Sequence, residues 1–105
     1  MRMWMVNPKY MCKNHLLGEH LECHMFVGTL NAGKDIQGYL NNQLLEIHNI
    51  KKRHDILVKE MKRRGYNHKS KLPKYHKITA GFISVKDNIY EIQRRCKDCR
   101  KLHKH

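Results

Sequence analysis

An imidazole and two carboxylates lie at helical spacing near the start of the chain, between His15 and Glu22. At 100° per residue, His15, Gly18 and Glu22 fall within about 60° of one another on one helix face. A carboxylate and an imidazole beside the bare backbone of a glycine can form one wall of an acid–base site. The alternative is an ordinary solvated helix surface, which would include Glu19. Spacing alone leaves both interpretations open.

The end of the chain carries a second pattern, Cys96-Lys-Asp-Cys99 followed by His103 and His105. This Cys-x2-Cys-x3-His spacing is one that can bind zinc. A structural zinc site needs four ligands, however, and Cys12 and Cys23 are too far apart in sequence to form a matching pair. Cys96 also falls on an apolar stripe, where a reduced cysteine is a small hydrophobic side chain. We therefore predict no metal site and no cofactor.

The nine histidines also invite an HNH-type nuclease interpretation, through His48-Asn49 and His54. Such a site would be framed by paired Cys-x2-Cys motifs around a ββα unit, and no such motifs flank His48-Asn49 and His54 in this sequence. His54 is better explained as a residue in the seam of a helix.

Three helices are expected to position these residues. The first begins at Asn7-Pro8, a favourable helix start, and runs to about Ala32, with Gly33 as its end. Its buried face is predicted to consist of Tyr10, Leu17, Leu21 and His24, widened by Leu16 and Leu30. Gly18 and Gly28 weaken this helix, which predicts that something approaches the backbone closely at both positions.

The second and third helices are predicted from apolar spacing and from their ends. Residues 33–42 indicate a loop, and residues 66–83, interrupted by Pro73, indicate a second irregular segment. Between them, a helix ending at Gly65 has a seam of Ile47, Ile50, His54, Leu57 and Met61, with Leu44 and Val58 beside it. The third helix begins at Ser84, a capping residue, and continues through the stripe Val85, Ile89, Ile92 and Cys96. The tail from Arg100 to His105 is expected to fray.

Composition agrees with an all-α fold in which one compact domain, residues 1–105, packs about three helices around one core. The chain has 22 Lys and Arg against 9 Asp and Glu, a formal net charge of +13. Such a charge favours binding to phosphate backbones. The longest uncharged apolar stretch is about half of a membrane span, and the N-terminus lacks a signal-peptide pattern. We therefore expect no membrane association and a cytoplasmic protein with reduced cysteines.

Two stretches carry a resemblance to a known family. They are Asn14-His15-Leu16-Leu17-Gly18-Glu19-His20-Leu21-Glu22, and the stretch from Arg53-His54 through Glu60-Met61-Lys62-Arg63-Arg64-Gly65-Tyr66-Asn67. They resemble the catalytic helix and the middle helix of the pyrimidine-dimer DNA glycosylases, the phage endonuclease V-like repair enzymes. The resemblance covers most of residues 1–67 and, more weakly, residues 84–100.

The resemblance implies a DNA glycosylase that is also an AP lyase, acting on double-stranded DNA that contains a damaged base. In this family the nucleophile is the α-amine of the chain and a first-helix glutamate is its acidic partner, which correspond here to Met1 and Glu22. The resemblance also places Arg2, Asn14 and His15 at the DNA. Leu21 and Met25 stand where the family has two DNA-gripping arginines, so the lesion that is excised stays open.

Further contacts to phosphate are expected from basic side chains, among them Lys13, Arg63 and Arg64, with Lys9 and Lys62 as additional candidates. The alternative for each is ordinary solvated charge.

The implied chemistry is physically reasonable on this chain. An α-amine usually titrates near pH 7.7–8.0, so roughly a tenth of it is neutral at pH 7, against well under 1% of an ordinary lysine. A neutral amine can attack the deoxyribose C1′ of an extruded nucleotide and leave an imine on the sugar. Residues 1–6 span at most ~20 Å. Glu22 lies about 21 Å along the helix from Pro8, so the amine can just reach it.

Two other functions remain as alternatives. One is a non-catalytic or retargeted family member, which binds DNA or removes another modified base. The other is a zinc-dependent nucleic-acid binder that uses Cys96, Cys99 and His103. In each case we expect a monomer in the cytoplasm, or at the host nucleoid if the protein is phage-encoded.

Overall fold

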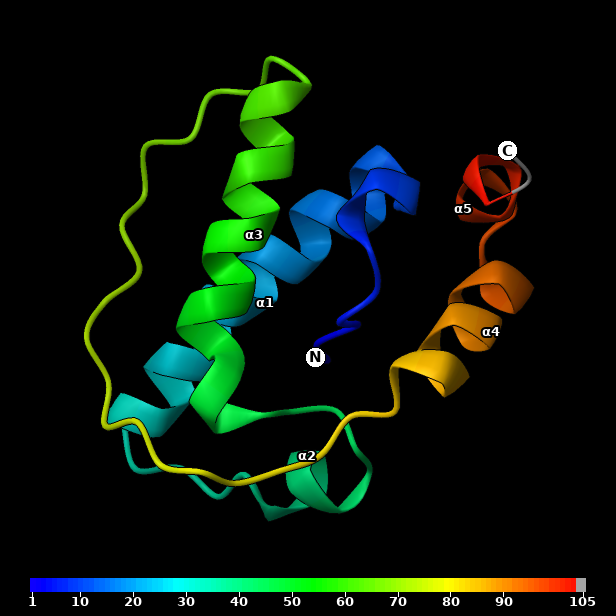
Figure 1. Cartoon of the computed structure of the whole chain (residues 1–105). Coiled ribbons are helices and arrows are strands. Elements are labelled where there is room, and N and C mark those ends of the chain that lie inside the picture. Colours follow the sequence, from blue (N-terminus) through cyan, green and yellow to red (C-terminus); the bar gives the residue numbers. More distant parts are fainter. Residues whose placement is uncertain (104–105) are drawn as a thin grey trace.

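The computed structural model describes residues 1–103, and every regular element in that range is a helix (Figure 1). In chain order these are the 3-10 helix η1 (Pro8–Tyr10), α1 (Lys13–Asn31), α2 (Gln37–Asn41), the 3-10 helix η2 (Ile47–Asn49), α3 (Ile50–Arg63), α4 (Val85–Arg95) and α5 (Lys97–Leu102). The all-α prediction is therefore confirmed. None of the helices within residues 1–103 combines the length and the apolar character needed to cross a membrane.

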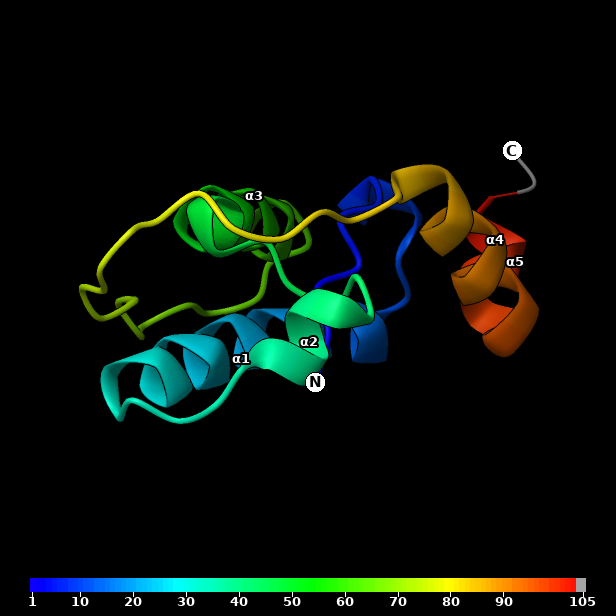
Figure 2. The ribbon, with the colours of Figure 1, turned by 90° about the horizontal axis from the view of Figure 1, so that it is seen from below.

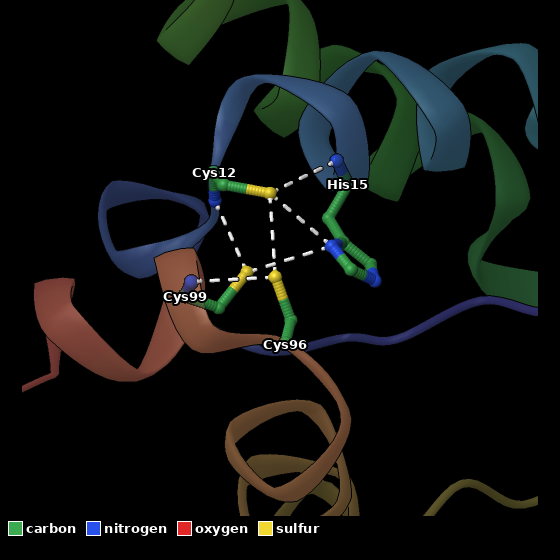
Figure 3. Close-up of side chains that lie close together, drawn as sticks. All are labelled: Cys12, His15, Cys96 and Cys99. Atoms are coloured by element: carbon green, nitrogen blue, oxygen red, sulfur yellow. Dashed lines mark hydrogen bonds between the residues drawn. The ribbon is translucent and has the colours of Figure 1, made fainter.

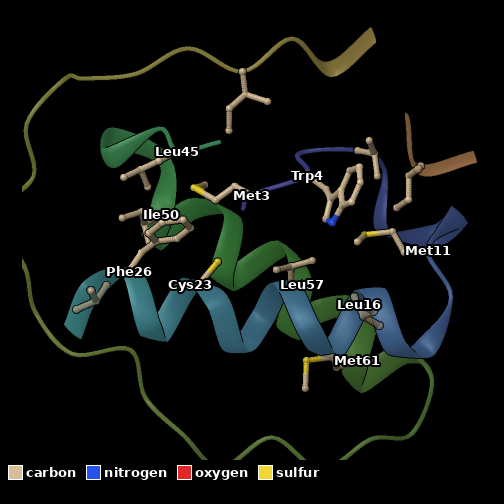
Figure 4. Close-up of a cluster of buried hydrophobic side chains, with 14 of the residues drawn as sticks. Met3, Trp4, Met11, Leu16, Cys23, Phe26, Leu45, Ile50, Leu57 and Met61 are labelled. Carbon is tan, nitrogen blue, oxygen red and sulfur yellow. The ribbon is translucent and has the colours of Figure 1, made fainter. Parts of the chain in front are cut away.

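The core lies where α1 packs against α3 and the N-terminal segment crosses both helices (Figures 2 and 4). Its largest fully buried side chains include Met3, Met11, Leu16, Phe26, Ile50 and Leu57. Burying a side chain of this size stabilises the fold by about 1.5–3 kcal/mol. A backbone hydrogen bond from Met3 N–H to the Leu44 carbonyl (2.8 Å) fixes the N-terminal segment across the helices. The first residues of the chain are thus part of the core.

A buried ion pair joins α1 to α3. Arg53 donates from Nε to Glu19 Oε2 (2.7 Å) and from Nη2 to Glu19 Oε1 (2.9 Å), and both side chains are almost fully buried. Both carboxylate oxygens are therefore satisfied, which is the geometry a desolvated pair requires. Glu19 is a structural residue in this fold and not the solvated carboxylate that the spacing allowed.

The predicted second helix is present as α3, although Ile47 of its predicted seam lies in η2 and Leu44 precedes both helices; the irregular segment after it is confirmed. Ile50, His54, Leu57 and Met61 are buried along α3. Gly65 follows that helix with φ +85°, a conformation that glycine adopts without strain. The chain beyond it runs as an irregular segment to Ser84 along the outside of α3 (Figure 1).

The first predicted helix differs in two respects. It is broken at Met11 and Cys12, so that α1 proper begins with Cys12 as its N-cap. Its predicted buried face is wrong at Leu21, which is 59% exposed, whereas Leu16 is buried and Leu17 and Leu30 pack partly buried against the core. The residues of α1 that are buried are Leu16, Glu19, Cys23, Phe26 and Val27.

The glycine prediction is also wrong: within residues 1–103, no atom of another segment lies within 4 Å of a Cβ built at Gly18 or Gly28. The predicted loop 33–42 contains the short helix α2.

The third predicted helix begins as expected, with Ser84 Oγ accepting a hydrogen bond from Asp87 N–H (3.2 Å). It is interrupted at Cys96, where α5 starts. Val85 and Ile89 of the expected stripe are exposed, and Ile92 is buried. The expected tail is helical through Leu102, whereas His105 lies outside the described residues.

Candidate active site

An open cavity of about 430 Å³ lies between the N-terminal segment and one face of α1. Its lining consists of Met1, Arg2, Trp4, Asn14, His15, Gly18, Glu19, Leu21, Glu22 and Met25. The cavity therefore brings together two segments that the sequence separates, the start of the chain and the middle of α1. His15, Gly18 and Glu22, which the helical spacing placed on one face, all line it.

The α-amine and a carboxylate face each other at this cavity. The Met1 nitrogen lies 4.0 Å from Glu22 Oε1, and the two side chains are 14% and 26% exposed. Burial raises the pKa of Glu22, while the positive charge of the α-amine and a hydrogen bond from the Arg2 backbone act in the opposite direction. An amine and a carboxylate are thus adjacent, at a cavity that is open to solvent.

Arg2 is held beside the amine by two contacts. Its guanidinium stacks on the Trp4 ring at 3.8 Å from the ring centroid, and its Nη2 donates to Asn88 Oδ1 (2.7 Å). Asn88 in turn donates to the Trp4 carbonyl (2.8 Å). The Arg2 Nε is buried and has no hydrogen-bond partner within residues 1–103. Burial and the nearby charge of Arg95 lower the pKa of Arg2. An anion such as a phosphate would stabilise the charged guanidinium at this position.

His15 forms the end of the cavity nearest the start of α1. Its ring meets that of Trp4 edge-on, with centroids 5.6 Å apart. Burial lowers its pKa, and the negative charge of Glu19 opposes that shift. Its Nδ1 faces the sulfurs of Cys12 (3.2 Å) and Cys99 (3.6 Å). Asn14, the neighbouring residue expected at DNA, is exposed.

The three other expected DNA contacts lie outside the cavity. Lys13 is exposed, with its Nζ 5.5 Å from the centre of the Tyr66 ring. Arg63 is 62% exposed and forms an ion pair with Glu60 at 2.6 Å. Arg64 is largely buried and donates to Glu60 and to the carbonyls of Pro8 (2.9 Å) and Met11 (2.7 Å). Arg64 therefore holds η1 against α3 in this structure, whereas Lys13 and Arg63 are available to phosphate.

Two residues of the site were not identified from the sequence. Trp4 shapes the cavity wall and stacks on Arg2, and Asn88 of α4 bonds to both. The single tryptophan next to the predicted nucleophile was the only available signal for Trp4. Nothing local marks Asn88, because its partners lie more than eighty residues away.

The net charge of +13 on this all-α chain favours a polyanionic partner such as nucleic acid. The comparison with protein families narrows this class: the family described as pyrimidine dimer DNA glycosylase matches residues 1–74. The chain belongs to this family. No curated protein and no solved structure matches the chain.

Proposed function

We propose that this protein excises pyrimidine dimers from double-stranded DNA and then cleaves the strand at the resulting sugar, with the α-amine of Met1 as nucleophile. The observation that carries the proposal is the 4.0 Å separation between that amine and Glu22 Oε1 beside an open cavity. Membership in the family supports the glycosylase step. The lyase step follows from the chemistry of an amine at C1′.

The proposed reaction uses the amine, the nucleotide and water, and it needs no cofactor. The neutral amine forms a bond to C1′ of the deoxyribose while the C1′–N bond to the base breaks, and its electron pair leaves with the base. Loss of a proton from the attached nitrogen and opening of the sugar ring give an imine at C1′ and a hydroxyl at C4′. Removal of a C2′ proton then expels the 3′ phosphate by β-elimination. Water hydrolyses the imine and restores the amine.

Glu22 has two functions in this scheme. Its carboxylate stabilises the positive charge that develops at C1′ as the base leaves. It then accepts the protons that the amine nitrogen and C2′ release. The raised pKa of Glu22 suits it to proton transfer, because a less acidic carboxyl is a stronger base near neutral pH.

DNA binding on this account combines base extrusion with phosphate contacts. C1′ of a stacked nucleotide is inaccessible to the amine, so the nucleotide is turned out toward the cavity. Arg2, Asn14 and His15 line the cavity, and in this proposal they hold the extruded nucleotide. Lys13 and Arg63 contribute exposed charge for the flanking backbone. The protein acts as a monomer, since one chain supplies every group in this scheme.

The cavity rim favours a second candidate, a glycosylase directed at another modified base. Leu21 and Met25 are 59% and 46% exposed at this rim, where the resemblance predicts arginines. An apolar rim contacts bases and sugars more favourably than phosphates. Excision assays on duplexes with a cyclobutane dimer or a single modified base distinguish the two candidates.

Borohydride trapping tests the proposal itself. Reduction converts the imine to a stable amine, so the native chain should become covalently attached to dimer-containing and abasic duplexes. An absence of adduct on both duplexes, with DNA binding intact, would contradict it.

A further inference from the structure

Three cysteines and one histidine from opposite ends of the chain meet beside η1 (Figure 3). Cys12 and His15 belong to the start of α1, and Cys96 and Cys99 to the start of α5. Their four ligand atoms all lie within 4.8 Å of one another. All four cysteines of the chain are free thiols, so no disulfide accounts for this grouping.

The separations match those of a tetrahedral zinc site. Zn–S bonds of about 2.3 Å at a tetrahedral angle place two sulfurs about 3.8 Å apart, and a sulfur and a nitrogen about 3.5 Å apart. Cys12 Sγ lies 3.8 Å from Cys96 Sγ. His15 Nδ1 lies 3.2 Å from Cys12 Sγ and 3.6 Å from Cys99 Sγ. A disulfide would need sulfurs about 2.05 Å apart.

The backbone around the sulfurs is arranged for thiolates. Cys12 N–H donates to Cys99 Sγ (3.2 Å), Cys99 N–H to Cys96 Sγ (3.4 Å), and His15 N–H to Cys12 Sγ (3.5 Å). A neutral thiol is a weak acceptor, whereas a metal-bound thiolate carries charge that such donors stabilise. Three donors directed at three sulfurs thus favour a metal-bound state.

We propose that Cys12, His15, Cys96 and Cys99 bind one structural Zn²⁺ that joins the start of α1 to α5. The zinc site considered from the sequence used Cys96, Cys99 and His103. The proposed site keeps the two cysteines and replaces His103 with Cys12 and His15. His103 Nδ1 lies 3.0 Å from the Cys99 carbonyl, and its ring packs on Tyr10. The second pair is Cys12 and His15, which only the fold brings to the Cys-x2-Cys turn. Since His15 also lines the cavity, the zinc fixes one wall of the candidate active site.

Metal analysis of the full chain, with Co²⁺ as a spectroscopic probe, tests this site. Co²⁺ bound to the native chain should show thiolate-to-metal charge-transfer absorption and the intense visible bands of tetrahedral coordination. Cys96→Ser should weaken Co²⁺ binding and lower the charge-transfer intensity per bound metal, because one of three thiolates is lost, whereas Cys23→Ala, which removes the one cysteine outside the cluster, should change neither. His15→Cys should retain the metal in a four-thiolate site, and this variant keeps the test valid if Cys96→Ser does not fold.

Several results would overturn the zinc proposal. They are a native chain that takes up Co²⁺ without charge-transfer bands, a Cys96→Ser variant that keeps the native affinity and the native band intensity, or iron bound to these cysteines in the purified protein. All of these readouts are independent of DNA excision, so the proposal stands or fails separately from the proposed function.

A second cluster of possible metal ligands, independent of the cysteines, consists of histidines on the other side of α1. His20 and His24 of α1, His54 of α3 and His68 of the following segment place their ligand nitrogens within 4.8 Å of one another. His24 Nε2 lies 3.2 Å from His54 Nε2, against about 3.4 Å for two nitrogens on a tetrahedral zinc. Nε2 of His20 and of His68 are buried without a hydrogen-bond partner in the described part of the chain.

Asp55 completes the arrangement. Its Oδ1 lies 3.1 Å from His54 Nδ1, so the ring nitrogen that does not face the cluster has a carboxylate partner. Such a carboxylate–histidine pair is the usual support of a zinc-bound imidazole. We infer that His20, His24, His54 and His68 bind a second Zn²⁺, which ties the irregular segment to α1 and α3.

Stoichiometry distinguishes the two sites. The native chain should bind two zinc ions, and His54→Gln should bind one while keeping the Co²⁺ charge transfer of the cysteine site. His76→Gln, a change at an exposed histidine in the same segment, should still bind two. His68→Ala offers a variant outside the α1–α3 core with the same expected loss. One zinc in the native chain at the cysteine site, or two zincs in both His54→Gln and His68→Ala, would overturn the histidine site.

Discussion

Two faces of α1 each carry a glutamate, and the environments of the two carboxylates differ. On the face toward the N-terminal segment, Glu22 lies partly exposed, 4.0 Å from the Met1 amine. One turn earlier, on the face toward α3, Glu19 is buried and both of its oxygens are bonded to Arg53. A carboxylate that is buried and bonded through both oxygens to an arginine is fixed in position and shielded from solvent. The difference places the more accessible carboxylate on the face that the helix packing leaves open.

The largest effect expected on the open face comes from Glu22→Gln. Loss of the charge should lower the excision rate by at least about 100-fold, because the carboxylate acts on the transition state. Binding to damaged duplex should stay within about tenfold, and the free energy of unfolding should barely change. Single-turnover excision, a binding titration and thermal melting measure the three quantities. Excision at the native rate would remove Glu22 from the proposed mechanism.

The corresponding change on the packed face is Glu19→Ala. Removing one partner of a buried pair leaves the Arg53 charge without compensation, which costs about 3–5 kcal/mol of folding stability. Chemical denaturation of Glu19→Ala and Glu22→Gln side by side should show the loss in the first variant alone. Equal destabilisation by both changes would mean that the two carboxylates contribute equally to folding stability.

Much of the scaffold was predictable because its determinants are local. The apolar spacing of Ile50, Leu57 and Met61 predicted α3, and the side chain of Ser84 predicted the start of α4. The breaks at Cys12 and Cys96 were not predictable, because they lie where segments from opposite ends of the chain meet. Leu21 was misplaced for a related reason. The irregular N-terminal segment lies along that side of α1 and leaves Leu21 at an open cavity rim, where a packed helix would have buried it.

The candidate site was predictable only in part. Helical spacing placed His15 and Glu22 on one face, and the resemblance added Met1 and Arg2. The structure brings all four to one cavity, and their roles stay predictions. Trp4 and Asn88 depend on contacts between distant segments, which composition and periodicity do not encode.

Arg64→Ala and Arg63→Ala compare a packed cation with an exposed one on adjacent residues. Arg64→Ala removes bonds to the Pro8 and Met11 carbonyls and should cost about 1–3 kcal/mol of stability. Arg63→Ala should leave the stability nearly unchanged, because Arg63 is exposed to solvent, but should reduce the salt slope of duplex binding by about one. Melting curves and salt titrations of both variants test this. A large loss of stability in Arg63→Ala would contradict it.

The smallest effects are expected from two glycines of α1. Gly18 lines the cavity, Gly28 does not, and a Cβ at either position meets no atom of another segment. Gly18→Ala and Gly28→Ala should each stabilise the helix by about 0.5–1 kcal/mol. Only Gly18→Ala should slow excision, because its methyl group occupies substrate space. Identical excision by the two variants would show that the substrate does not approach α1 at Gly18.

The central claim, that the α-amine of Met1 is the nucleophile, is tested most directly by blocking that amine. Acetylation converts the amine to an amide, whose nitrogen is not nucleophilic. One extra residue ahead of Met1 displaces the amine by about 3.5 Å, which positional catalysis does not tolerate. Borohydride trapping on an abasic duplex should give no adduct with either blocked form, although both should bind DNA. Lys9→Ala and Lys13→Ala should trap as the native chain does. If a blocked chain traps as well as the native one, a lysine is the nucleophile and the account is wrong.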